Sequence, residues 1–227
     1  MRVLSIDTAL SACAAAVFDA EAGKVLASET LALARGHAEA LMPLIARVMQ
    51  QAHTQFSELD RVAVTIGPGS FTGLRVGISA ARGIGLVSGK PTVGISTLSA
   101  YAAPHIANED GDAILVAIDA RHGQVYLQVF SSAGRTVVAP GVAMVRDAVE
   151  AASTGPARIV GSAALLVASA WPPELEPPRL VDPQDAPSIQ WVARLGAVAP
   201  RPEAAPTPLY LRPPDARPQD AARLPRR

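Results

Sequence analysis

Short apolar runs bounded by turn residues alternate along the first hundred residues with two segments of helical periodicity. Leu41, Ile45 and Val48 recur at helical spacing, which predicts a helix over residues 37–52. Apolar and small residues predict a second helix over residues 72–88. The strand-like runs cover residues 2–6, 11–18, 24–31, 61–66 and 92–95. This order of three strands, a helix, a strand and a second helix indicates an α/β fold.

The same order begins again, more weakly, in the second half of the chain. Its elements are expected at residues 113–119, 124–130, 135–139, 144–152, 157–161 and 188–198. Asp7 and Asp119 end the first strand of each copy. We therefore predict two repeated lobes, residues 1–100 and 101–211, followed by a flexible tail at residues 212–227 that is rich in proline and arginine.

The composition argues against several classes of protein. Lysine plus arginine and aspartate plus glutamate each total 20, so the chain lacks the basic excess of a protein that binds nucleic acid alone. Cys13 is the only cysteine, which rules out an internal disulfide and fits a reducing compartment. Asp7 interrupts the apolar core that a signal peptide needs, and three cationic residues interrupt the apolar stretch at residues 72–90. We therefore expect a cytoplasmic protein that does not bind membranes.

A glycine-rich loop precedes the second helix. It consists of Gly67, Pro68, Gly69, Ser70, Phe71 and Thr72. A glycine turn at a helix N-terminus can bind phosphate through its free N–H groups. The strict motifs fail here, because Thr72 stands where a dinucleotide-binding loop has its third glycine, and no Gly-Lys-Ser/Thr follows. We interpret the loop as a tight strand-to-helix turn in which Ser70 or Thr72 caps the helix.

The sequence also lacks a complete catalytic or metal-binding set. None of the four histidines has a second histidine three or four residues further on, and no Gly-x-Ser-x-Gly motif is present. Asp7 and Asp119 are candidates for a pair of carboxylates that hold magnesium phosphate across the two lobes. Neither is followed directly by the glycines that let a backbone approach phosphate, so we regard both as vestigial phosphate-site positions. No catalytic residue, cofactor or metal is predicted.

Five stretches together carry a resemblance to a known family. They are RVLSIDTALSACAAAV, RGHAEALMPLI, GPGSFTGLRVGISAARGIG, IDARHGQVY and PLYLRPPDA. The glycine segment is highly specific, and the match spans nearly the whole chain. On these residues the sequence resembles the TsaB (YeaZ) family of bacterial tRNA threonylcarbamoyladenosine biosynthesis proteins. The resemblance implies an actin-like (ASKHA) fold of two ribonuclease-H-like lobes, in agreement with the repeat.

The resemblance also implies a role without catalysis. The family partners its paralogue TsaD, which transfers the threonylcarbamoyl group to the adenosine next to the tRNA anticodon. The ATPase TsaE joins the two proteins, and TsaC makes the activated intermediate. TsaD carries a His-x-x-x-His metal pair on its first helix, whereas the comparable stretch here has His37 and then Leu41. The implied role is a scaffold or activator that forms a homodimer when alone and meets tRNA only through the complex.

An enzyme of the same fold is the alternative that the sequence leaves open. It would be a glycoprotease-like metallopeptidase or an ATPase that acts alone. A tightly bound metal, or ATP turnover by the purified chain, would favour the enzyme over the scaffold.

The helix at residues 72–88 is apolar on nearly every side, and only Arg75, Ser79 and Arg82 form a polar stripe. Because a helix that covers only its own sheet should show water a broad polar face, we expect a partner to cover it. Small residues at every fourth position, among them Gly77, would let another helix approach, and Gly77→Leu should then leave a folded chain without its partner. In agreement with the resemblance, the predicted interface is His37, Leu41, Leu44, Ile45, Val48, Gly73, Leu74, Gly77, Ile78, Ala81 and Gly85. The alternative is that the two helices cover only each other and the second lobe.

Overall fold

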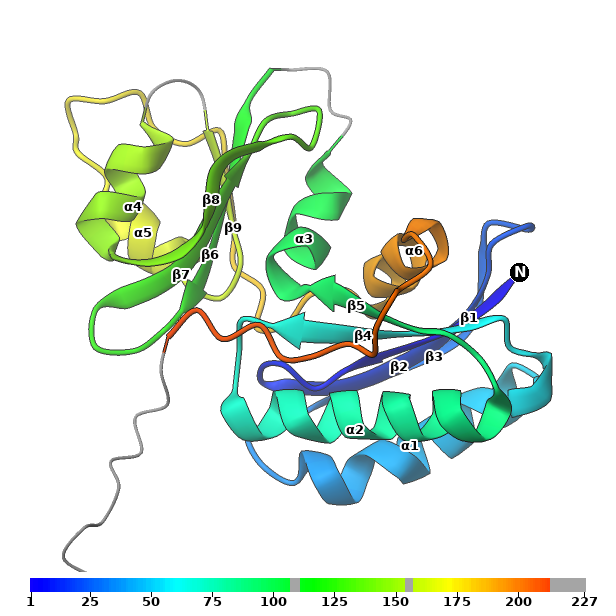
Figure 1. Cartoon of the computed structure of the whole chain (residues 1–227). Coiled ribbons are helices and arrows are strands. Elements are labelled where there is room, and N and C mark those ends of the chain that lie inside the picture. The colour runs from blue at the N-terminus through cyan, green and yellow to red at the C-terminus, as the bar shows by residue number, and fades with distance from the viewer. Residues whose placement is uncertain (107–110, 154–156, 213–227) are drawn as a thin grey trace, which may run out of the picture.

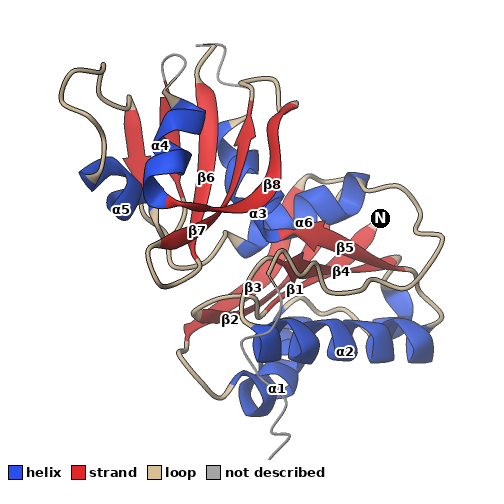
Figure 2. Ribbon diagram, turned by 60° about the vertical axis from the view of Figure 1, so that its left-hand side comes forward, coloured by secondary structure: helices blue, strands red, loops and turns tan. Residues whose placement is uncertain are grey.

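The computed structural model describes residues 1–106, 111–153 and 157–212, which form two lobes (Figure 1). The elements of the N-terminal lobe are β1 (Arg2–Asp7), β2 (Ala12–Asp19), β3 (Lys24–Ala32), α1 (His37–Gln51), β4 (Arg61–Gly67), α2 (Phe71–Ser88) and β5 (Thr92–Ser96). The five strands form one sheet in the order β3-β2-β1-β4-β5. Helices α1 and α2 lie side by side beneath this sheet (Figures 1 and 2).

The C-terminal lobe repeats this arrangement. Its elements are β6 (Ala113–Asp119), β7 (Gln124–Phe130), β8 (Thr136–Met144), α4 (Val145–Ala152), β9 (Ala157–Val160), α5 (Ala164–Ser169) and β10 (Leu180–Asp182). The strand order is β10-β9-β6-β7-β8, and β6 pairs with β7 and β9 as β1 pairs with β2 and β4. The predicted repeat is therefore confirmed, and Asp7 and Asp119 end equivalent strands.

The last helix of each repeat packs on the sheet of the other lobe (Figure 1). Helix α3 (Thr97–Ala102) covers the C-terminal sheet, where Leu98 belongs to the same buried cluster as Val116. Helix α6 (Ile189–Val198) covers the upper face of the N-terminal sheet with Val192. The two lobes are therefore interlocked, because each needs the other's last helix to cover one face of its sheet.

This exchange changes the extents of the two lobes. The predicted boundary at residue 100 falls inside α3. Helix α6 lies within the predicted range 101–211 of the C-terminal lobe, yet it packs on the N-terminal sheet. Leu209 also joins this lobe, since its N–H donates a hydrogen bond to the Ile66 carbonyl oxygen at 2.7 Å. Five elements were not predicted from the sequence: α3, α5, β10 and the short 3-10 helices η1 (Phe56–Glu58) and η2 (Ala103–His105).

The sequence of β1 is almost continuously apolar because both faces of this strand are buried. Leu4 and Ile6 face the core that α1 and α2 cover, whereas Val3 belongs to the core beneath α6. Ser5 is buried on the α6 side, where its hydroxyl lies 3.3 Å from the carbonyl oxygens of Ala16 and Ile189. A strand that is buried on both faces has no solvent side on which polar residues could alternate with apolar ones.

Cys13 lies in β2 and is fully buried in the core between the sheet and α1. Burial raises the pKa of its thiol to about 11, so the thiol stays protonated at neutral pH. Cys13 therefore packs as a small hydrophobic residue.

No helix within the described residues is both long and apolar enough to span a bilayer.

Candidate functional site

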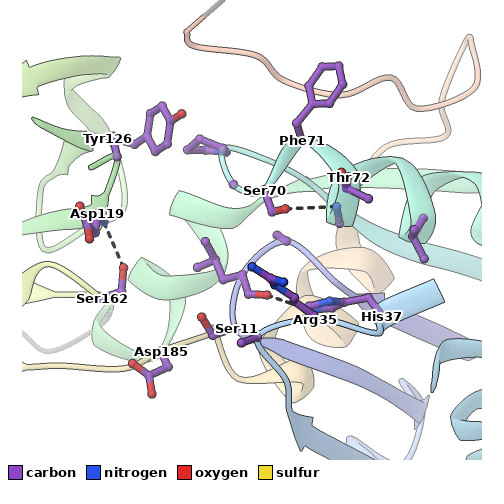
Figure 3. Close-up of a pocket in the computed structure, with 18 of the residues that line it drawn as sticks. Ser11, Arg35, His37, Ser70, Phe71, Thr72, Asp119, Tyr126, Ser162 and Asp185 are labelled. Carbon is purple, nitrogen blue, oxygen red and sulfur yellow. Dashed lines mark hydrogen bonds between the residues drawn. The ribbon is translucent and has the colours of Figure 1, made fainter. Parts of the chain in front are cut away.

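A cleft of about 910 Å³ opens between the two lobes (Figure 3). The N-terminal lobe contributes the turn after β1, the start of α1 and the loop at residues 68–72. The C-terminal lobe contributes Asp119 at the end of β6, the hairpin that leads to β7, and Ser162. Residues 209–212 form part of the wall. The predicted glycine-rich loop and one of the two predicted aspartates therefore meet in this cleft.

The glycine-rich loop is the strand-to-helix turn that the sequence predicts. Gly67 ends β4 and Phe71 begins α2. Ser70 caps the helix, because its Oγ accepts a hydrogen bond from the Gly73 N–H at 3.3 Å. Thr72 is exposed in the first turn of the helix.

The turn after β1 packs directly onto this loop. The Ser70 N–H donates to the Ala9 carbonyl oxygen at 2.7 Å, and the Thr8 hydroxyl donates to the Gly73 carbonyl oxygen at 2.7 Å. Glycine is needed at 69 and 73, because a Cβ at either position would collide with the backbone of the turn. A phosphate cradle needs backbone N–H groups that point into an open space. Here the chain's own carbonyl groups fill that space.

Asp7 lies beneath this turn and does not line the cleft. Its Oδ1 accepts hydrogen bonds from the Thr65 hydroxyl at 2.5 Å and from the Ala9 N–H at 3.0 Å. Its Oδ2 is buried and has no hydrogen-bond partner among the residues that the structure describes. Burial raises the pKa of Asp7, although the hydrogen bonds from Thr65 and Ala9 oppose the rise. The carboxyl group is thus sealed inside the N-terminal lobe.

Replacing Asp7 with asparagine should therefore stabilise the chain more at high pH than at low pH. An amide keeps both hydrogen bonds at Oδ1 and removes the charge. Because the pKa of Asp7 is raised in the folded chain, the contribution of this one carboxyl group to stability is fully present below its ordinary pKa of 3.8 and is lost as the pH rises through the folded-state pKa. Melting curves of both proteins at pH 5 and pH 8 test this. If the melting temperature of the variant exceeds that of the wild type by less at pH 8 than at pH 5, the prediction is contradicted.

Asp119 occupies the equivalent position in the C-terminal lobe but is exposed to the cleft (Figure 3). Its Oδ1 accepts a hydrogen bond from the Arg121 N–H at 2.7 Å, and its own N–H donates to the Ser162 Oγ at 3.1 Å. The Ala120 N–H donates to the Gln124 carbonyl oxygen at 3.0 Å. In this lobe, too, the first N–H groups after the strand are used within the chain. The structure does not bring the two aspartates together as a pair.

The hairpin after Asp119 has an unusual backbone. Arg121 and His122 adopt left-handed conformations with φ angles of 64° and 53°, which cost about 1 kcal/mol or more for residues other than glycine. Such strain is a marker of functional sites. Arg121 enters the cleft from one lobe and Arg35 from the other. Neither side chain forms an ion pair with another of the described residues.

Few of the residues that line the cleft were predicted as site residues from the sequence. The residues that were not predicted are Arg35, Arg121, Tyr126, Ser162, Asp185 and residues 209–212. Several of them lie in the stretches that carry the family resemblance. Arg35 begins RGHAEALMPLI, Arg121 and Tyr126 lie in IDARHGQVY, and residues 209–212 lie in PLYLRPPDA.

The predicted interface residues of α1 and α2 lie inside the N-terminal lobe. Leu41, Leu44, Ile45 and Val48 of α1, and Leu74 and Ile78 of α2, are all buried against the lobe's own sheet. Each helix turns its most apolar stripe toward the sheet, because that burial contributes to folding. These side chains are therefore unavailable to a partner.

The small-residue stripe of α2 faces the same way, so in the isolated chain its residues pack against the lobe's own sheet and the turn after β1. A Cβ on Gly73 would meet the Thr8 backbone, and a Cβ on Gly77 would meet the Thr8 hydroxyl. A Cβ on Gly85 would meet the Thr92 hydroxyl, and Ala81 is fully buried. The stripe lets the turn after β1 and the start of β5 approach the helix.

His37 is half-buried at the start of α1. Its Nε2 lies 3.0 Å from the Leu10 carbonyl oxygen, close enough for an N–H there to donate a hydrogen bond. Among the described residues, no group of three or more histidine, cysteine, aspartate or glutamate side chains is placed to bind a metal ion.

Known proteins resemble this chain in sequence and in structure. A family model described as "TsaD: tRNA N6-adenosine threonylcarbamoyltransferase" matches residues 24–177. The Escherichia coli protein named tRNA threonylcarbamoyladenosine biosynthesis protein TsaB is 37% identical over 126 residues, and the match spans 56% of this chain and only 53% of that protein. The uncharacterized protein Rv3421c of Mycobacterium tuberculosis is 35% identical over 216 residues, which cover 95% of this chain and 94% of that protein.

A solved structure extends this likeness to the fold. The crystal structure of an uncharacterized Pseudomonas aeruginosa protein with similarity to the peptidase YEAZ matches with a TM-score of 0.78 at 24% identity, over 93% of this chain and 99% of that chain. The chain belongs to the family of TsaD-like domains and, within it, to the TsaB (YeaZ) family. The predicted actin-like (ASKHA) fold of two ribonuclease-H-like lobes is confirmed.

Proposed function

We propose that the chain is a cytoplasmic, non-catalytic scaffold and activator subunit in the formation of threonylcarbamoyladenosine on tRNA. In this proposal it pairs with a TsaD paralogue and the ATPase TsaE, forms a homodimer when alone, and meets tRNA only through the complex. The name of the E. coli relative and the match to the TsaD family model support tRNA modification as the process.

The closed turn after β1 is the observation that carries the non-catalytic part of the proposal. A phosphate site between this turn and the N-terminus of α2 would need free backbone N–H groups and open space there. Here Thr8 and Ala9 fill that space with direct hydrogen bonds to Ser70 and Gly73. An ATPase or metallopeptidase that acts alone is the second candidate function. Assays of ATP turnover and peptide cleavage by the isolated chain test it.

The outer faces of α1 and α2 support the pairing part of the proposal. Met42 of α1 is 49% exposed, and Leu86 and Val87 of α2 are 84% and 90% exposed. Arg75, Ser79, Arg82 and Leu86 follow one another along the exposed side of α2 at helical spacing. The partner surface that we propose therefore uses the exposed residues of the two predicted helices in place of the buried ones.

Reconstitution from purified components tests the function. The chain, a TsaD paralogue and TsaE from the same organism are mixed with unmodified tRNA, threonylcarbamoyl adenylate and ATP, and the modified nucleoside is quantified by mass spectrometry. We expect modification only when the chain and the TsaD paralogue are both present, and none from the chain alone. Full modification without the chain would contradict the scaffold role, and ATP turnover or peptide cleavage by the chain alone would favour the second candidate.

The isolated chain should bind magnesium ATP with a dissociation constant in the high micromolar range or weaker. The reason is that the Ala9 N–H after Asp7, and the Ala120 and Arg121 N–H groups after Asp119, already donate hydrogen bonds within the chain. Titration calorimetry measures the affinity, with magnesium chloride alone as the control titration. A one-to-one site tighter than about 1 μM, roughly −8 kcal/mol, would contradict this expectation.

A further inference from the structure

The last described segment, residues 206–212, is attached to both lobes, and we call it the C-terminal strap. It runs along β4 toward the bottom of the C-terminal lobe (Figure 1). Pro206 is buried, and a Cβ on Gly94 of β5 would lie 3.2 Å from the Pro206 Cβ. The Leu209 N–H donates to the Ile66 carbonyl oxygen at 2.7 Å. The first part of the strap is therefore fixed to β4 and β5.

The middle of the strap is fixed to the first turn of α2. The ring of Tyr210 stacks on that of Phe71 with 5.1 Å between the ring centroids. The Arg75 Nε donates a hydrogen bond to the Tyr210 hydroxyl at 3.2 Å, and the Arg75 guanidinium lies 3.8 Å from the centroid of Phe71. Two residues at the start of α2 therefore hold Tyr210: Phe71 by ring stacking and Arg75 by a hydrogen bond.

The end of the strap is fixed to the other lobe. Leu211 packs against the buried cluster that α3 forms with the C-terminal sheet. The Arg212 Nη1 donates hydrogen bonds to the Ala120 carbonyl oxygen at 3.2 Å and to the Gln124 Oε1 at 3.3 Å. Both acceptors lie in the β6–β7 hairpin, on the opposite side of the cleft from α2. A single short segment therefore joins the two walls of the cleft.

We propose that the C-terminal strap is a clamp that sets the angle between the two lobes and holds the cleft at its present width. The covalent crossings between the lobes run beside α3 and α6, and they do not tie α2 to the β6–β7 hairpin. The strap ties α2 to this hairpin, although it contributes no strand to either sheet. Any movement that widens the cleft must separate Tyr210 from α2 or Arg212 from the hairpin. This inference concerns the isolated chain and does not depend on the proposed function.

Distances between spin labels test the clamp. Labels are placed at Ala22→Cys, in the turn after β2, and at Glu150→Cys, on α4; both positions are exposed, whereas Cys13 is buried. In this background, Leu211→Ser with Arg212→Ser cuts the strap from the C-terminal lobe. Pulsed electron paramagnetic resonance should then show a distance distribution that is at least about twofold broader. The matched control is Glu203→Ala, an exposed position before the strap that should leave the distribution unchanged.

Hydrogen exchange gives a second readout in the same variants. The Ala120 and Gln124 amides should exchange at least about tenfold faster once the strap is cut, whereas amides in the core of β1 should not change. If the double variant fails to fold, Arg212→Ala alone is measured, since it removes only the contacts of this guanidinium and should give a smaller broadening. A folded variant with an unchanged distance distribution and unchanged hairpin exchange would overturn the proposal.

Discussion

The Gly77→Leu variant of the isolated chain is expected to lose about 3 kcal/mol or more of its free energy of unfolding. A Cβ at this buried position would collide with the Thr8 hydroxyl and lie 3.5 Å from the Val64 Cγ2, and the rest of a leucine side chain would point the same way. The packed core between α2 and the sheet has no space for it. The melting temperature, followed by circular dichroism, should fall by roughly 6–12 °C.

Gly83→Leu provides the matched control on the same helix. Gly83 is exposed, and a Cβ there would meet no atom within 4 Å. Because leucine favours helix more than glycine does, this variant should be as stable as the wild type or more stable by up to about 0.8 kcal/mol. Equal melting temperatures for the two variants would mean that Gly77 faces open space. The interpretation of the glycine stripe as a contact for another helix would then hold after all.

The sequence predicted elements whose periodicity is local. The strand expected at residues 2–6 is β1, and the helix expected at residues 37–52 is α1, each within a residue of its observed bounds. Asp7 and Asp119 were correctly expected at equivalent places, because each ends an apolar run that is followed by two more strands. The weaker second copy was still predicted, since its strands keep the same order along the chain.

The packing partners of these elements could not be predicted. Leu74 and Leu86 are the same residue type on one helix, yet the first is buried and the second is 84% exposed. The covered side of α2 is the side that packs against the turn at Thr8, which is distant in sequence. This turn can contact the helix only because glycines on that side leave room for it. Likewise, α6 resembles any amphipathic helix, and only the open face of the N-terminal sheet decides where it packs.

The cleft was harder to predict because its residues come from both ends of the chain. Arg121 reaches it through a left-handed backbone that its residue type disfavours. Tyr210 meets Arg75 across 135 residues of sequence. No periodicity links such positions, so only the stretches shared with a known family pointed to them.

Placing a negative charge on the outer face of α2 should separate the chain from its partner without unfolding it. Leu86 and Val87 are 84% and 90% exposed in the isolated chain, and in the proposed complex they are covered. Leu86→Glu with Val87→Glu would bury two carboxylates against an apolar surface, which costs several kcal/mol when they are unpaired. We expect the affinity for the TsaD paralogue, measured by sedimentation velocity, to fall at least about 100-fold, roughly 2.7 kcal/mol.

Val198→Glu is the matched control for this last experiment. Val198 is also an apolar residue at the end of a helix of the N-terminal lobe, and it is 80% exposed, but it lies on α6 and not on α2. A general effect of added charge would weaken the complex in both proteins, whereas the proposed interface predicts a loss only for the α2 variant. If the α2 variant is folded and binds the paralogue as tightly as the Val198→Glu control, the partner surface lies elsewhere on the molecule. The homodimer of the isolated chain should dissociate in parallel, because the same two helices form both interfaces in the proposal.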